Sequence, residues 1–169
     1  MTEVINRPNY KSSHLIDFEE LSTQERIKIL LETLKRTNLK TLSRGSLVNL
    51  ERSINASTEV GGHLMSGHIH FTGKVIKTSF KDSTGDILIK FSAKFKEYIF
   101  EKGYIGLNGC SLTLGKVNKD SFYIHLIPET LSVTNLKNLK KDSLVNVEID
   151  QNTIAIVETV KNTLATQKF

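Results

Sequence analysis

From residue 71 onward, the chain alternates apolar and polar residues over short stretches that are separated by turn-forming residues. Over residues 86–92, for example, Ile87, Ile89 and Phe91 fall on one face, which is the pattern of a half-buried strand. The same pattern predicts strands over 71–80, 86–92, 104–107, 111–117, 122–127 and 144–149. Residues 94–102 instead predict one short helix. Six short strands at this spacing predict a small closed barrel.

The two ends of the chain have a helical period instead. Ser22-x-x-Glu25 has the form of a capping box and predicts a helix that runs through Leu31. Over residues 152–165, apolar residues such as Ile154 and Val157 recur at helical spacing. An isolated amphipathic helix must bury its apolar stripe, and two partners remain open: the chain's own barrel or another subunit.

A segment of the chain occurs twice. Residues 32–51 read ETLKRTNLKTLSRGSLVNLE, and residues 129–148 read ETLSVTNLKNLKKDSLVNVE, an offset of 97 residues (129 − 32). Such a polar segment would not recur this faithfully by chance, so we infer a duplicated module of about a hundred residues. The first copy is incomplete, because counting 97 residues back from Phe71 passes the start of the chain.

Composition narrows the class of protein. The 38% hydrophobic and 24% charged residues are typical of a globular protein that buries a core. No apolar run is long enough for a membrane span, and the first residues lack a secretory signal pattern. Cys110 is the only cysteine, which favours a reducing, cytoplasmic setting. The net charge of +5 is spread along the chain without a nucleic-acid-binding motif, so we expect no nucleic-acid partner.

Three motifs in fixed order point to a family. They are GGHLMSGH at 61–68, KGYIGLNGCSLT at 102–113 and LIPETL at 126–131. Together with the repeat, they closely resemble riboflavin synthase, a family with two lumazine-binding repeats, and the resemblance extends from about residue 32 to 164. It implies a mainly β fold of tandem six-stranded Greek-key barrels with a C-terminal α-helix. The expected divisions are an incomplete first barrel at 1–62, a second barrel at 63–151, and a helix at 152–169 that is a possible oligomerisation element.

The resemblance also implies a reaction. Two molecules of 6,7-dimethyl-8-ribityllumazine exchange a four-carbon unit and give riboflavin and a ribitylamino-pyrimidine, without a metal or an organic cofactor. In the family, the site forms between subunits, usually of a homotrimer. The alternative is a non-catalytic lumazine- or flavin-binding protein of the same superfamily. The family's usual opening Met-Phe-Thr-Gly segment is missing here. Three explanations remain open: a mis-started reading frame, a degraded gene, or a protein that binds without turnover.

The resemblance assigns roles to individual residues. The catalytic candidates are His68, Ser111, Thr113 and Asp150. The substrate-binding candidates come from both copies: Glu32, Thr33, Leu34, Lys35, Arg36, Thr37, Gly67, His68, Ile69, Lys102, Ser111, Leu112, Thr113, Ile127, Pro128, Glu129, Thr130, Leu131 and Ser132.

Each assignment has an ordinary structural alternative. Ser111 and Thr113 alternate on a strand and so face the same side, where their hydroxyls can also bond to the backbone. Asp150 has the position of a helix N-cap. His63, His68 and His70 have a spacing that suggests metal binding, but the lack of a nearby carboxylate pair or cysteine cluster argues against a metal. A buried structural thiol is the expected role of Cys110.

Overall fold

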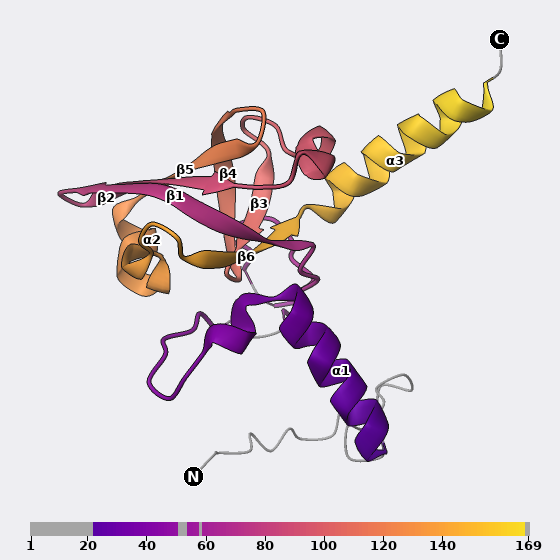
Figure 1. Ribbon diagram of the computed structural model, residues 1–169. Helices are drawn as coiled ribbons and strands as arrows, with labels where there is room; N and C mark the ends of the chain where they lie inside the picture. Colours follow the sequence, from indigo (N-terminus) through magenta and orange to yellow (C-terminus); the bar gives the residue numbers. More distant parts are fainter. Residues whose placement is uncertain (1–21, 51–53, 58, 168–169) are drawn as a thin grey trace. The chain divides into compact units, whose positions relative to one another are not determined.

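The computed structural model describes residues 22–50, 54–57 and 59–167 (Figure 1). The chain divides into two compact units, Met1–Thr33 and Leu34–Phe169. The helices are α1 (Thr23–Arg36), η2 (Asn38–Thr41), η3 (Ala93–Tyr98), α2 (Pro128–Val133), η4 (Asn135–Asn138) and α3 (Gln151–Thr166), where η marks a 3-10 helix. The strands are β1 (Phe71–Lys81), β2 (Thr84–Lys90), β3 (Tyr104–Leu107), β4 (Cys110–Val117), β5 (Ser121–Leu126) and β6 (Leu144–Ile149).

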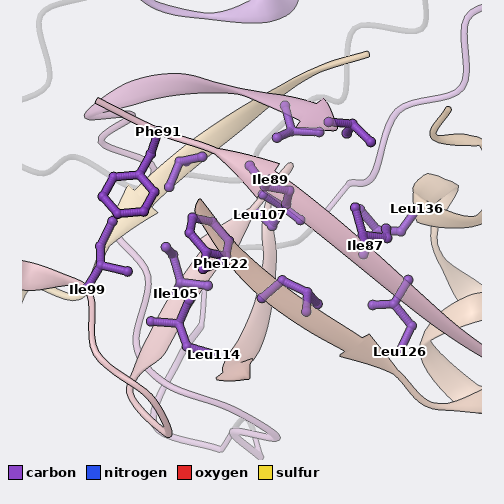
Figure 2. Packing of buried hydrophobic residues seen from close by; sticks show 14 residues of the cluster. Ile87, Ile89, Phe91, Ile99, Ile105, Leu107, Leu114, Phe122, Leu126 and Leu136 are labelled. Atoms are coloured by element: carbon purple, nitrogen blue, oxygen red, sulfur yellow. The ribbon is translucent and has the colours of Figure 1, made fainter. Parts of the chain in front are cut away.

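The six strands close into an antiparallel barrel in the order β1-β2-β5-β4-β3-β6. Three consecutive strands, β3, β4 and β5, lie side by side, and β6 returns to lie beside β3, which is the Greek-key arrangement. The predicted barrel is therefore confirmed, as is the inward face of Ile87, Ile89 and Phe91. Figure 2 shows these residues packed with Phe122 from β5 and Ile105 and Leu107 from β3 in the barrel interior.

Several elements differ from the sequence expectation. The strand expected over 86–92 is β2, which spans Thr84–Lys90. The helix expected over 94–102 is a shorter 3-10 helix, η3. The helix expected to end at Leu31 continues as α1 to Arg36. The segment after the fifth strand, for which no helix was expected, forms α2 and begins at Pro128, because a proline at the first helical position has no amide hydrogen to leave unbonded.

The two copies of the repeat adopt the same local structure. Thr37 before η2 and Thr134 before η4 have φ values of −120° in both cases, and each side chain accepts a hydrogen bond from the backbone N–H two residues later. The two copies differ in solvent exposure over the residues that form β6 in the second copy. Val145 is fully buried in the barrel, whereas its first-copy counterpart Val48 is 47% exposed. In the part of the chain that the structure describes, one barrel is closed, and the first copy lies outside it.

Helix α3 begins directly after β6 and packs against η3 over its first turns. Tyr98 of η3 donates a hydrogen bond to Glu158, and Lys161 forms an ion pair with Glu97. Figure 1 shows the helix continuing away from the barrel. Its apolar side chains Ile156, Val160 and Leu164 are accordingly exposed, so packing on the barrel covers only one end of the helix. Within the described residues, no helix is both long and apolar enough to cross a membrane.

Candidate functional site

A row of three residues crosses the outer face of the barrel. Gly106 in β3 pairs with Ser111 in β4 on one side and with Glu148 in β6 on the other. Residues that are directly paired across neighbouring strands point to the same face of a sheet. The segment 62–67, which we call the strap, contacts this row in order: His63 contacts Ser111, Met65 lies at Gly106, and Ser66 and Gly67 bind Glu148.

One end of the strap holds the Ser111 hydroxyl. The backbone N–H of His63 donates to Ser111 Oγ at 3.0 Å, and Nδ1 of the same imidazole lies 2.6 Å from that oxygen. The imidazole stacks on Tyr104 with ring centroids 5.3 Å apart. Its other nitrogen, Nε2, is buried and has no hydrogen-bond partner among the described residues. His63 therefore contacts Ser111 through both its backbone and its side chain.

The other end of the strap is fixed by a buried carboxylate. Glu148 is only 5% exposed, and its oxygens accept hydrogen bonds from Ser66 N–H at 2.7 Å, Ser66 Oγ at 3.0 Å and Gly67 N–H at 3.0 Å. Gly67 has a φ of +81°, a conformation that glycine adopts without strain. A buried carboxylate with three donors is well compensated for the loss of water, so Glu148 anchors the strap.

The middle of the strap depends on a missing side chain. A Cβ added to Gly106 would lie 2.9 Å from Met65 Sδ and 3.0 Å from Glu148 Cβ. Both distances are shorter than ordinary van der Waals contacts. Glycine at this position therefore allows the strap to lie directly on β3.

A cavity of about 650 Å³ opens beside the strap. It is lined by residues 59–67, by Asn49 from the first copy and Ile54 after it, and by Ile69, Gly109, Ser111 and Glu148. This volume is in the range of pockets that bind small organic molecules. The lining combines apolar side chains with a few polar groups, of which the Ser111 hydroxyl is held in place by His63.

The predicted site residues of the second barrel differ in where they lie. Ser111, Gly67 and Ile69 line the cavity. Leu112 packs against the barrel core instead, and Thr113 is exposed on β4. Strands β4 and β5 are antiparallel, with Leu114 opposite Ile124. The start of β4 therefore lies next to the end of β5, from which Ile127 leads into α2. The predicted segment Ile127, Pro128, Glu129, Thr130, Leu131 and Ser132 thus lies at the same end of the barrel as Ser111.

Other predicted residues do not line the cavity themselves and have structural partners. His68 Nδ1 lies 2.8 Å from Ser66 Oγ. Asp150 is the N-cap of α3, where it accepts hydrogen bonds from Asn152 N–H, Thr153 N–H and Thr153 Oγ1. Lys102 is exposed, with a φ of +67°, and its N–H donates to Leu114 O. The N-cap alternative for Asp150 is therefore confirmed, while its catalytic role stays a prediction.

The first-copy candidates form the end of α1 and the turn that follows it. Glu32, Thr33, Leu34, Lys35 and Arg36 are exposed in the last turns of α1, and Thr37 is the buried N-cap of η2. The first copy reaches the barrel through later residues, because Asn49 Nδ2 donates to Asn108 O at 2.9 Å and lies 3.3 Å from Cys110 Sγ.

The three histidines considered as metal ligands each have a separate partner. His63 contacts Ser111, His68 contacts Ser66, and His70 Nδ1 accepts a hydrogen bond from Ile149 N–H at 3.1 Å. Burial lowers the pKa of His70 below its ordinary value, with Glu148 opposing this shift and His68 adding to it. The described residues contain no group of three or more side chains that could hold a metal ion.

Sequence reasoning missed the partners that hold the site. His63 was considered only as a metal ligand, and Glu148 and Ser66 were not singled out. A usable signal was present for Glu148, because it is a charged residue between Val147 and Ile149 in a predicted strand and it recurs in the first copy as Glu51. A charge repeated at such a position indicates a specific partner.

Comparison with known proteins places this geometry in a family. Residues 66–150 match the model of the lumazine binding domain. The chain is 45% identical over 141 residues to riboflavin synthase of Escherichia coli (strain K12), covering 83% of this chain and 66% of that enzyme. The chain therefore spans slightly less than two thirds of this relative's length.

Two solved structures are also similar. The structure of LumP complexed with riboflavin superposes with a TM-score of 0.65 and 28% identity, covering 71% of this chain and 65% of LumP. The structure of LumP complexed with 6,7-dimethyl-8-(1'-D-ribityl) lumazine gives a TM-score of 0.63 and 27% identity, covering 70% of this chain and 63% of LumP.

Proposed function

Because this chain belongs to the lumazine binding domain family, we propose that it is a riboflavin synthase that binds 6,7-dimethyl-8-ribityllumazine at the Ser111 end of its closed barrel. The observation that carries this proposal is the cavity beside the strap, in which a firmly held hydroxyl faces a volume suited to a bicyclic ring. The relationship to the Escherichia coli enzyme supports the reaction: two lumazines give riboflavin and a ribitylamino-pyrimidine.

The protein's contribution to this reaction is chiefly to hold two ligands in a fixed orientation. The dismutation joins two identical heterocycles, and fixing them together removes a large entropic barrier. Ser111 supports ring binding, and exposed Thr113 on the same strand adds a second hydroxyl. We assign contacts with the ribityl chain to Lys102 and to the segment 127–132, and proton transfer to His68.

The reaction also needs a second half-site. In the described residues, a single barrel is closed, so we propose that another subunit contributes the second ligand position in a homotrimer. The exposed stripe Ile156, Val160 and Leu164 on α3 is the proposed contact between subunits, because these residues repeat every four positions on one helix face. The lone Cys110 supports a cytoplasmic location.

A second function is favoured by one observation. The solved LumP structures are complexed with a ribityl lumazine and with riboflavin, so a protein that binds lumazine or flavin without turnover also fits.

Riboflavin formation distinguishes the two functions. The purified chain is incubated with 6,7-dimethyl-8-ribityllumazine, and the products are separated by chromatography, with Ser111→Ala as the control variant. Steady formation of riboflavin and ribitylamino-pyrimidine in equal amounts is the result expected of a synthase. Lumazine retained without conversion supports the binding protein, and absence of both binding and conversion would exclude both functions.

A further inference from the structure

The hydrogen-bond geometry at Ser111 limits where its proton can go. Ser111 Oγ accepts the backbone N–H of His63, and His63 Nδ1 lies 2.6 Å away. Two arrangements satisfy that second contact. Either Nδ1 carries the hydrogen and donates to Oγ, or Nδ1 is bare and accepts the serine proton.

The buried nitrogen of the same imidazole decides between these arrangements. If Nδ1 were bare, the neutral ring would carry its hydrogen on Nε2, which is buried and lacks a partner among the described residues. A buried N–H without an acceptor loses its hydrogen bonds to water and gains nothing in return. Among buried backbone groups, orphaned N–H donors are rarer than under-satisfied acceptors, and we apply the same preference to this imidazole, which favours a bare Nε2.

We propose that His63 is a positioning residue in the Nδ1–H form, which donates to Ser111 Oγ and thereby leaves the serine O–H free to donate to a ligand in the cavity. Both residues line that cavity, and stacking on Tyr104 fixes the plane of the imidazole. The group recognised is a hydrogen-bond acceptor on a flat heterocycle, such as a ring carbonyl or ring nitrogen. In this arrangement, His63 orients Ser111 and does not act as its general base.

This inference rests on the proposed function, since the ligand of that function receives the serine proton. It also makes a statement about the ligand-free chain that can be tested independently. In free histidine, the Nε2–H form is the more abundant one, so the Nδ1–H form of His63 would be a departure imposed by the fold.

The first test reads the tautomer directly. Ring ¹⁵N chemical shifts of the full chain are recorded by NMR without ligand, and the His63 signals are identified by their loss in His63→Asn. We expect the hydrogen on Nδ1. A hydrogen on Nε2 would overturn the proposal whether or not the chain binds lumazine.

The second test measures affinity for 6,7-dimethyl-8-ribityllumazine by its change in fluorescence. His63→Leu removes the donor, whereas His63→Asn keeps an N–H near the position of Nδ1. We expect His63→Leu and Ser111→Ala each to weaken binding about tenfold, the double variant to be no weaker than Ser111→Ala, and His63→Asn to bind within about threefold of the unaltered chain. Far-UV circular dichroism and urea unfolding identify variants that fail to fold, in which case His63→Asn and the NMR result decide.

The outcomes separate the two proposals. If the unaltered chain binds neither lumazine nor riboflavin, the proposed function is wrong, and the ligand part of this inference fails with it. If the unaltered chain binds but the effects of His63→Leu and Ser111→Ala multiply, the two residues act independently, and only the present inference is overturned.

Discussion

Asn38 and Asn135, which occupy the same position in the two copies of the repeat, each donate their backbone N–H to an asparagine of the opposite copy. Asn38 donates to Asn146 Oδ1 at 2.7 Å, and Asn135 donates to Asn49 Oδ1 at 2.8 Å. The side chains repeat this exchange, because Asn38 Nδ2 donates to Leu144 O and Asn135 Nδ2 donates to Leu47 O. The repeat therefore builds a locally two-fold symmetric contact that joins the first copy to the barrel.

The first prediction concerns this exchange. Asn49→Ala removes the acceptor of the Asn135 N–H and three donor contacts, so we expect the free energy of unfolding to fall by about 1–2 kcal/mol. Asn146→Ala should have an effect of similar size through Asn38. Urea unfolding measures both, with Asn162→Ala on the exposed part of α3 as the matched control. Equal midpoints for Asn49→Ala and Asn162→Ala would contradict the account.

The second prediction concerns the close approach of the strap to β3. Gly106→Ala introduces a methyl group 2.9 Å from Met65 Sδ, so we expect a loss of about 1–3 kcal/mol in stability and weaker ligand binding. Gly61→Ala is the control, because a Cβ added there meets no atom within 4 Å. Thermal unfolding of the two variants checks the difference. If Gly106→Ala is as stable as Gly61→Ala, the strap does not lie on β3 in solution.

The third prediction concerns the anchor of the strap. Glu148→Ala removes the acceptor of the Ser66 and Gly67 N–H groups, so these amides should exchange with solvent faster. Hydrogen exchange followed by NMR measures this directly, and amides of the β2–β5 ladder serve as the internal reference. Glu101→Ala, at an exposed glutamate, is the control and should leave both amides unchanged. Unaltered protection in Glu148→Ala would show that another group anchors the strap.

The fourth prediction is a dependence of stability on pH. His70 accepts the Ile149 N–H at Nδ1, which requires a bare nitrogen, and burial lowers the pKa of its imidazole. As the pH falls below about 6.5, the unfolded chain takes up the proton before the folded chain does, so the free energy of unfolding decreases until the pH reaches the lowered folded-state pKa.

A substitution isolates that contribution. His70→Asn retains an acceptor oxygen but does not titrate, so its urea midpoint should change less than that of the unaltered chain between pH 7.5 and 5. His125→Asn, at an exposed histidine paired with Asp86, is the matched control. Identical pH profiles for the unaltered chain and His70→Asn would rule out a contribution from His70.

The barrel could be predicted from the sequence because its evidence is local. Alternation such as Ile87, Ile89 and Phe91 identifies a strand and its inward face without knowledge of its neighbours. The resemblance also predicted that Ser111 and the segment 127–132 belong to one site, and this stays a prediction. The Greek-key pairing came only through resemblance, since the alternation does not state which strands meet.

The arrangement around Ser111 could not be predicted in the same way. His63 and Ser111 are far apart in sequence, and their contact depends on the strap crossing β4, β3 and β6 at Gly106. The roles of Glu148 and Ser66 arise from the same crossing. Asp150 illustrates the opposite case, because an N-cap is defined by the residues that immediately follow it, and that alternative was visible in the sequence.

The most direct test of the central claim is the stoichiometry of lumazine binding to the unaltered chain. Isothermal titration with 6,7-dimethyl-8-ribityllumazine should give saturable binding of one molecule per closed barrel, and Ser111→Ala should weaken it without loss of the fold. If the folded chain shows no saturable binding, or if Ser111→Ala binds as tightly as the unaltered chain, the cavity beside the strap is not a lumazine site.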